Sequence, residues 1–240
     1  MIEISAVSKT YSGKVKAVDS LSLTIQPGEI IGFIGPNGAG KTTTIKMMTG
    51  ILKPDSGSIK LNGINIQDQP LEAKRQFGYV SDNPDLFLRL KGIEYLNFMA
   101  DIYEVPESQR RERIDRYATM FEMTSALSDK ILSYSHGMRQ KIILMGVLIH
   151  DPLIWILDEP LTGLDPQSAY SLKETMKLQA ELGKTVFFST HVLEVAEKLC
   201  TKVAIINKGQ ILYYGTLDEL KKNHEGKSLE DIFLAVTSHA

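Results

Sequence analysis

The sequence predicts an α/β fold: a mostly parallel sheet covered by helices, with an N-terminal antiparallel β subdomain and an inserted helical subdomain. Three observations predict it. From residue 138 onward apolar strands alternate with amphipathic helices, the first 25 residues alternate apolar with polar side chains, and residues 81–133 show helical spacing without a convincing strand. Regular β/α alternation is typical of parallel sheets, whereas alternation with a period of two is typical of antiparallel strands.

The first part of the chain is expected to hold the antiparallel strands and the first strand of the parallel sheet. Residues 1–7 and 15–25 alternate apolar and polar side chains, and a turn over residues 26–29 follows them. The apolar run over residues 30–34 indicates a strand buried on both faces. The elements expected next are a helix over 41–51, a hairpin between turns at 54–57 and 62–63, a short helix over 69–75 and a strand over 77–80.

The rest of the chain is expected to complete one domain over residues 1–240. Residues 1–80 and 150–220 would form the α/β core, about 81–149 the helical subdomain, and 221–240 a C-terminal tail. The later elements expected are helices over 138–149, 166–182, 192–199, 228–236 and from 216, and strands over 153–157, 185–189, 203–207 and 210–214.

The composition is that of a globular protein. Of 240 residues, 43% are hydrophobic, and the formal net charge of -2 gives no general electrostatic reason to expect nucleic acid as a partner. A single cysteine, Cys200, excludes an internal disulfide. The longest apolar stretch, Ile142–Ile149, is far shorter than the roughly 18 residues that a membrane-spanning helix needs, and the start lacks a signal-peptide pattern. We therefore expect no transmembrane segment.

The strongest local motif lies between the buried strand at residues 30–34 and the helix that follows. Residues 35–42, Gly-Pro-Asn-Gly-Ala-Gly-Lys-Thr, match G-x-x-x-x-G-K-[ST] in full and in the context that confirms it. Glycines let consecutive backbone N–H groups face nucleotide phosphates, and the N-terminal end of the helix adds partial positive charge. Lys41 would neutralise phosphate charge, and the Thr42 hydroxyl would ligate Mg²⁺. The placement disfavours the alternative, a glycine-rich turn without function.

Two consecutive carboxylates follow the apolar segment Ile154–Leu157. Asp158 and Glu159 would lie at the carboxyl edge of the sheet, where open α/β folds bind ligands. Asp158 would hold Mg²⁺ directly or through water, and Glu159 would polarise the attacking water. Carboxylates at strand ends are common, so this interpretation depends on the phosphate loop being present as well.

The two motifs together indicate a P-loop nucleoside triphosphatase and leave several classes open. A GTPase would be expected to carry N-K-x-D, and the nearest segment, Asn207-Lys208-Gly209-Gln210, lacks the aspartate. A dinucleotide-binding fold would carry G-x-G-x-x-G at the start of the helix, and this sequence does not.

Further segments resemble the ATP-binding cassette (ABC) family, and the resemblance covers nearly the whole chain. Residues 132–140 resemble the family's signature motif, whose usual core is L-S-G-G-Q. Residues 161–165 follow the carboxylates directly and resemble its D-loop, which ends here at Asp165. His191 resembles the family's switch histidine, and Tyr11 resembles the aromatic residue that stacks on adenine. Several unrelated patterns in the family's order are stronger evidence than any one of them.

The resemblance implies the ATPase subunit of an ABC transporter, working as a head-to-tail dimer with two nucleotides between its subunits. The signature residues Ser135, His136 and Gly137 would contact ATP held by the opposite subunit. A hydroxyl and free N–H groups before a long helix suit a phosphate, although an ordinary helix cap is the alternative for Ser135. The implied partners are a second ABC ATPase subunit, as a homo- or heterodimer, and integral membrane permease subunits, with this chain peripheral on the cytoplasmic face of the membrane. The residues expected to act are Lys41, Glu159 and His191 in catalysis, Tyr11, Gly35, Pro36, Asn37, Gly38, Ala39, Gly40, Lys41, Thr42 and Thr43 in ATP binding, and Thr42, Asp158 and Asp82 in Mg²⁺ binding.

Two departures from the family pattern bear on the chemistry. The signature has Tyr134 for leucine, His136 for the first glycine and Met138 for glutamine, which removes the glutamine expected to contact ribose. Asp82 stands where the Q-loop usually has glutamine, and a carboxylate there would still ligate Mg²⁺. With the segment 228–234, these departures resemble bacterial ATPases that serve separately encoded permeases, including antibiotic-resistance systems, and favour export over import.

Two other functions compete with transport. A soluble ABC ATPase could act in regulation or on nucleic acid or ribosomes, but such relatives usually carry two cassettes, long coiled coils or zinc modules. This sequence has one cassette, no coiled-coil heptads and one cysteine. A small-molecule kinase with the same phosphate loop would not explain the signature and D-loop segments.

Overall fold

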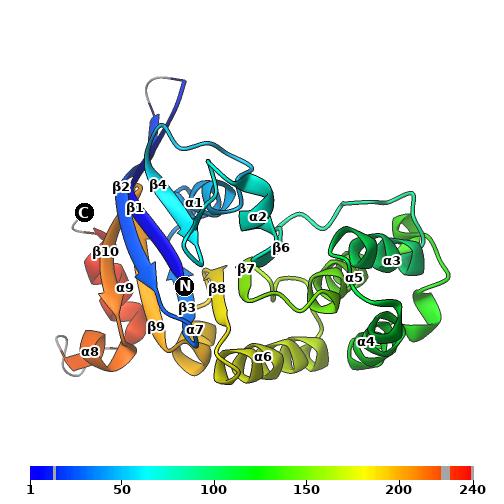
Figure 1. Cartoon of the computed structure of the whole chain (residues 1–240). Helices are drawn as coiled ribbons and strands as arrows, with labels where there is room; N and C mark the ends of the chain where they lie inside the picture. The colour runs from blue at the N-terminus through cyan, green and yellow to red at the C-terminus, as the bar shows by residue number, and fades with distance from the viewer. Residues whose placement is uncertain (13–14, 223–227, 239–240) are drawn as a thin grey trace.

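Two β-sheets and the helices around them make up the fold of this computed structural model (Figure 1). The structure describes residues 1–12, 15–222 and 228–238. Within them, a six-stranded sheet has the order β10–β9–β3–β8–β7–β6, and a four-stranded sheet has the order β2–β1–β4–β5. The strands are β1 (Ile2–Tyr11), β2 (Val15–Ile25), β3 (Ile30–Ile34), β4 (Ser56–Leu61), β5 (Ile64–Asn65), β6 (Phe77–Val80), β7 (Ile154–Asp158), β8 (Thr185–Thr190), β9 (Lys202–Asn207) and β10 (Gln210–Gly215).

The larger sheet is parallel from β6 to β9, and only β10 runs antiparallel to its neighbour. The carboxyl ends of β3, β6, β7 and β8 therefore meet at one edge. The smaller sheet is antiparallel throughout. The predicted combination of a mostly parallel core and an antiparallel N-terminal subdomain is confirmed.

Alternate residues of the buried strands face opposite sides of the larger sheet. Trp155 and Leu157 of β7 pack with the helices of the inserted segment, whereas Ile154 and Ile156 pack with α1 and the antiparallel sheet. Strands β3, β7 and β8 are buried along their whole length, as the uninterrupted apolar run at residues 30–34 predicts for β3. This double burial holds the strand ends rigid, which suits a site built on them.

Figure 1 shows α3, α4 and α5 gathered at one end of the molecule, away from the antiparallel sheet. Helix α5 connects this group to the core, because its residues 140–149 are all buried and it contacts β6. The helices are α1 (Lys41–Met48), α2 (Pro70–Lys74), α3 (Gly92–Ile102), α4 (Glu107–Met120), α5 (His136–Ile149), α6 (Pro166–Glu181), α7 (Leu193–Leu199), α8 (Leu217–Lys222) and α9 (Leu229–Ser238), with 3-10 turns η1 (Thr124–Ala126) and η2 (Ile131–Ser133).

The main differences from the predicted elements lie at their ends. Strand β1 runs beyond residue 7 to Tyr11, because it goes on pairing with β2 as far as the pair Tyr11–Val15. Helix α1 ends at Met48 rather than near residue 51, since Gly50 adopts a left-handed conformation (φ 68°). Helix α5 begins at His136 rather than Met138, because Ser135 caps it.

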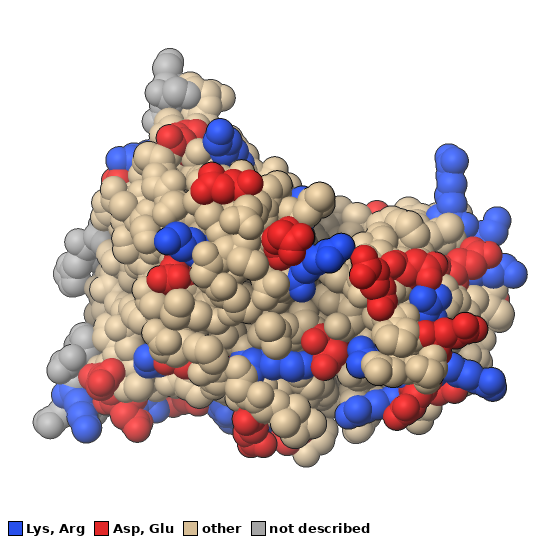
Figure 2. All heavy atoms as spheres, in the orientation of Figure 1, with Lys and Arg blue, Asp and Glu red and all other residues tan. Residues whose placement is uncertain are grey.

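The surface adds two observations. Among the described residues, no helix is both long enough and apolar enough to cross a membrane. Lysine and arginine side chains are interspersed with aspartate and glutamate on the face shown in Figure 2, without a continuous basic patch there.

Candidate functional site

A pocket of about 250 Å³ lies at the carboxyl edge of the larger sheet. The strand ends explain its position, since β3 leads into the phosphate loop, β7 ends in two carboxylates, and the segment after β6 passes beside them. This is the edge at which parallel α/β sheets bind ligands. The described residues that line the pocket are Ala17, Asn37, Gly38, Gly40, Lys41, Thr42, Thr43, Asp82, Asp158 and Glu159.

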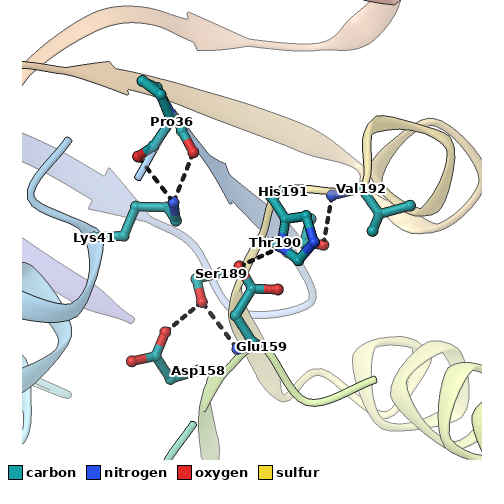
Figure 3. Close-up of polar contacts among 9 residues, drawn as sticks. Pro36, Lys41, Asp158, Glu159, Ser189, Thr190, His191 and Val192 are labelled. Carbon is teal, nitrogen blue, oxygen red and sulfur yellow. Dashed lines mark hydrogen bonds and ion pairs between the residues drawn. The ribbon is translucent and has the colours of Figure 1, made fainter. Parts of the chain in front are cut away.

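The Lys41 side chain closes the phosphate loop on itself (Figure 3). Its Nζ donates to the carbonyl oxygens of Gly35 at 2.6 Å and Pro36 at 3.2 Å. Burial lowers the pKa of Lys41, and the negative charges of Glu159 and Asp158 partly oppose that shift. The loop thus carries a nearly buried ammonium group held by two neutral carbonyl groups, which a phosphate oxygen could replace.

Glycine is required at two positions of this loop. Gly40 has φ 107°, and a Cβ atom there would lie 2.5 Å from the carbonyl oxygen of Ala17. A Cβ atom on Gly35 would lie 2.4 Å from the carbonyl oxygen of Ile206. The loop is therefore pressed against the strands on either side, and larger residues at these positions would displace it.

The N-terminal end of α1 faces the pocket without a side-chain cap. Gly40 occupies the cap position, and the first turn contains no acidic residue. Thr42 and Thr43 line the pocket, whereas the Thr44 hydroxyl donates to the Gly40 carbonyl oxygen at 2.9 Å. Uncapped N–H groups and the helix dipole make this end suitable for an anion.

Asp158 is 1% exposed and makes one strong hydrogen bond, in which the Ser189 hydroxyl donates to its Oδ1 atom at 2.5 Å. Its other oxygen, Oδ2, is buried and receives no hydrogen bond of ordinary geometry from the described residues. Burial raises the pKa of Asp158, and the negative charges of Asp82 and Glu159 raise it further. Hydrogen bonds from the Ser189 and Thr42 hydroxyls partly oppose this shift in pKa. A buried carboxylate with a free oxygen beside a threonine hydroxyl fits a hard divalent cation.

Asp82 completes the oxygen groups on this side of the pocket. It lies two residues beyond the end of β6, and its Oδ1 atom accepts a hydrogen bond from the Ser81 hydroxyl at 3.2 Å. The described residues contain no cluster of three or more His, Cys, Asp or Glu side chains that could hold a metal ion. The donor set of Thr42, Asp158 and Asp82 nevertheless fits Mg²⁺, which usually takes one or two carboxylates and completes its shell with phosphate and water.

Glu159 is placed by an unusual backbone conformation and two contacts (Figure 3). Its φ angle of 48° lies in the left-handed region, which costs a non-glycine residue energy. Its N–H donates to the Ser189 hydroxyl at 3.0 Å, and its Oε1 atom lies 3.0 Å from Nδ1 of His191. The carboxylate and the imidazole, from the ends of β7 and β8, therefore form a pair at the rim of the pocket.

Ser189 is a site residue that the motifs did not reveal. It holds both Asp158 and the Glu159 backbone, because β7 and β8 pair in parallel with Asp158 opposite Ser189. A serine before Thr190 and His191 at the end of a predicted strand was the available signal. Ala17 was missed too, and nothing in its local sequence distinguishes it.

The signature segment lies outside this pocket. Ser135 is the cap of α5, and its hydroxyl accepts a hydrogen bond from the Met138 N–H at 3.3 Å. Its neighbours pack against the D-loop: a Cβ atom on Gly163 would lie 2.5 Å from the His136 ring, and one on Gly137 would lie 2.5 Å from the Gly163 carbonyl oxygen. The signature and the D-loop therefore form one surface within this chain.

Tyr134, the first departure from the signature pattern, is a packing residue. It is buried, and its hydroxyl donates to the Ala126 carbonyl oxygen at 2.6 Å. The larger side chain is accommodated because Gly92 lies against it, where a Cβ atom would be 2.3 Å from the tyrosine oxygen.

Asp165 joins the D-loop to two helices. It caps α6 by accepting hydrogen bonds from the Ser168 N–H at 2.9 Å and the Ser168 hydroxyl at 2.8 Å. It also pairs with the nearly buried Lys141 of α5 at 2.7 Å. The Lys141 ammonium and the Ser168 donors hold the pKa of Asp165 well below its usual range. These contacts give Asp165 a structural role in addition to any role at a subunit interface.

Tyr11 is the one expected ATP-binding residue that neither lines the pocket nor adjoins the residues that line it. It lies at the end of β1 with 42% of its surface exposed, and it is not among the described residues that line the pocket. Its stacking on adenine stays a prediction. Of the other expected residues, the structure brings Asn37, Gly38, Gly40, Lys41, Thr42, Thr43, Asp82, Asp158 and Glu159 together in the pocket, and Gly35, Pro36, Ala39 and His191 adjoin them.

Comparisons with known sequences agree with these motifs. The sequence profile of the ABC transporter family matches residues 18–162, more than half of the chain. The chain is 34% identical to the ABC transporter ATP-binding protein NatA of Bacillus subtilis over 239 residues, covering 98% of this chain and 97% of NatA. It is 39% identical to an ABC transporter ATP-binding protein of Nostoc sp. over 86% of its own length, but spans only 62% of that protein.

Two solved structures are similar over nearly the whole chain. An ATP-binding subunit of an ABC transporter is 32% identical with a TM-score of 0.94, covering 98% of this chain and 99% of that one. A dimeric ATP-binding cassette in a post-hydrolysis state, bound to ADP and phosphate, is 25% identical with a TM-score of 0.82, covering 90% and 99% of the two chains.

Proposed function

Because this chain belongs to the ABC transporter family of ATP-binding proteins, we propose that it hydrolyses ATP to drive transport through a separate membrane permease. The observation that carries the proposal is that the phosphate loop, Asp158 and Glu159 line the same pocket. The related cassette with bound ADP and phosphate supports the ATPase activity. Residues 1–240 would act as one nucleotide-binding domain, with residues 81–149 as its helical signature subdomain and 221–240 as its tail.

The phosphate loop binds the polyphosphate of ATP. Lys41 exchanges the carbonyl oxygens of Gly35 and Pro36 for phosphate oxygens, which gives its buried ammonium group a charged partner. The uncapped N–H groups at the start of α1 face the same phosphates. Gly38, with φ 80° and no atom within 4 Å of a Cβ position, leaves room for that approach.

Thr42, Asp158 and Asp82 are the residues that would hold Mg²⁺, and the bound ion would supply charge neutralisation of the phosphates. Ser189 keeps Asp158 in one orientation, so that its buried Oδ2 atom stays free for the ion. This arrangement explains why a carboxylate is kept in a place where burial is unfavourable.

Glu159 and His191 act on the attacking water. Glu159 accepts a proton from it, and the strained backbone directs the carboxylate toward the pocket. His191 lies within hydrogen-bonding distance of Glu159, and it orients that carboxylate and contacts the γ-phosphate. Hydrolysis needs this positioning more than it needs covalent help from the protein.

A second ATPase subunit completes each site. Ser135, His136 and Gly137 would contact ATP in the opposite subunit, so ATP closes the dimer and hydrolysis opens it. The dimeric form of the related cassette supports this arrangement.

The chain would sit on the cytoplasmic face of the membrane against its permease, and cargo would be selected by the permease. The export direction stays a prediction from the sequence.

The dimer proposal is tested with Glu159→Gln, in which ATP binding continues while hydrolysis is slowed. This variant should become dimeric by light scattering when ATP is added, and it should hydrolyse ATP about 10²- to 10⁴-fold more slowly than the wild type. Combining it with Lys41→Ala should abolish the dimer, as a matched control. Wild-type turnover in Glu159→Gln would contradict the role of the carboxylate.

The transport proposal is tested by purifying the tagged chain from its native cells. A multi-span membrane protein should copurify from detergent-solubilised membranes, and this chain should leave the membrane fraction when the gene of that protein is deleted. Recovery from the soluble fraction with ribosomes or nucleic acid would favour the competing function instead.

A further inference from the structure

The nucleotide pocket carries an excess of negative charge before any nucleotide enters. Three carboxylates line it, Asp82, Asp158 and Glu159, against the single ammonium of Lys41 among its described lining residues. The Lys41 ammonium is also turned toward the carbonyl oxygens of the loop. A polyphosphate entering this pocket without a cation would therefore be repelled by the carboxylates.

Asp82 is the carboxylate whose charge is least compensated. It is exposed at the end of β6, accepts a hydrogen bond from the neutral Ser81 hydroxyl, and has no lysine, arginine or histidine within ion-pair distance among the described residues. Its charge nevertheless acts on Asp158 across the pocket. By contrast, Ser189 holds Asp158, and Glu159 lies against His191.

The Oδ2 atom of Asp158 provides independent evidence that a cation belongs here. This atom is buried, accepts no hydrogen bond of ordinary geometry from the described residues, and belongs to a side chain that lines the pocket. A buried carboxylate oxygen without a partner is costly unless a charged ligand satisfies it. One divalent cation near Asp158 and Asp82 would have two effects: it would give this oxygen a ligand, and it would cancel the excess negative charge of the pocket.

We propose that Asp82 makes nucleotide binding by this chain conditional on a divalent cation, so that metal-free ATP is rejected and only the metal complex binds well. The inference rests on the proposed ATP site and concerns what that site admits. A neutral glutamine at residue 82 would offer the cation an oxygen without repelling free ATP. The aspartate binds the cation more strongly and imposes the repulsion when the cation is absent.

The test is equilibrium binding of a fluorescent ATP analogue, measured in excess Mg²⁺ and again in EDTA. The quantity compared is the ratio of the dissociation constant in EDTA to that in Mg²⁺, which does not depend on catalytic activity. Four proteins are measured: the wild type, Asp82→Gln, Asp82→Glu and Glu181→Gln. Glu181 is the matched control, because it is exposed, does not line the pocket, and lies at the last residue of α6, about 20 Å along the helix from its first residue.

Asp82→Gln should lower the ratio at least about fivefold, mainly by strengthening binding in EDTA, since it removes one unit of charge from the pocket wall. Asp82→Glu and Glu181→Gln should keep the wild-type ratio. An unchanged ratio in Asp82→Gln, or an equal decrease in Glu181→Gln, would overturn the inference. If the wild type bound no analogue even in Mg²⁺, the proposed function itself would fail, which is a different result.

Discussion

Asp165 offers the sharpest test of how the fold supports the site. It caps α6 through the N–H and hydroxyl of Ser168 and pairs with Lys141 of the signature helix. Replacing it by alanine removes the cap and leaves a lysine with only 11% side-chain exposure without its partner. Replacing it by asparagine keeps a good cap but removes the charge. The two variants therefore separate the two tasks.

The magnitude follows from these contacts. Loss of a side-chain cap costs about 1 kcal/mol. Leaving Lys141 unpaired costs roughly another 1–2 kcal/mol, less than for a fully buried pair, because the Asp165 side chain is 42% exposed. Asp165→Ala should thus lose about 2–3 kcal/mol and Asp165→Asn about 1–2 kcal/mol. For a chain of this size the former corresponds to a decrease in Tm of about 5–10 °C.

The assay is urea unfolding followed by circular dichroism and by the fluorescence of Trp155, the single tryptophan, which is buried in β7. Repeating Asp165→Asn in a Lys141→Met background measures the coupling, and there the loss should shrink below about 0.5 kcal/mol. Glu194→Gln is the control, because it breaks a fully exposed ion pair with Lys198 and should change little. Equal losses from Asp165→Asn in both backgrounds would refute the coupling.

Further predictions concern the loop, the thiol and acid stability. Lys41→Ala should weaken ATP binding at least about a hundredfold in a fluorescence titration, and retained tight binding would count against the phosphate-loop assignment. Gly40→Ala should lower both ATP affinity and Tm, because the added Cβ atom would lie 2.5 Å from the Ala17 carbonyl oxygen. Burial raises the pKa of the Cys200 thiol to about 12, so a thiol reagent should label it rapidly in urea and slowly in the native protein. The folded-state pKa of Asp165 lies below its unfolded value of about 3.9, so its stabilisation is present at neutral pH and lost as pH falls below about 4. Asp165→Asn should therefore lose less stability on acidification than the wild type, and an identical acid dependence of urea midpoints would contradict this.

Local patterns in the sequence were sufficient to predict the helices and strands and the part of the site that would bind phosphate. The buried run at residues 30–34, the glycines and lysine after it, and the two carboxylates after residue 157 each belong to a continuous segment. Residues within one segment keep their relative positions whatever the rest of the chain does, so a glycine-rich turn between a strand and a helix predicts its own geometry. The order of the parallel strands does not follow from such segments alone.

Contacts between distant segments were decided only by the tertiary structure. Ser189 reaches Asp158 because β8 pairs with β7 in one particular register, and a shift by one residue would turn that hydroxyl to the other face. Lys141 reaches Asp165 because the first half of α5 lies against the start of α6, and the sequence showed neither the distance between these helices nor their directions. The position of Tyr11 outside the pocket likewise depends on how the two sheets sit against each other. The sequence alone therefore determined which groups this protein has for binding a nucleotide, whereas the packing of the sheets and helices determined which of those groups touch.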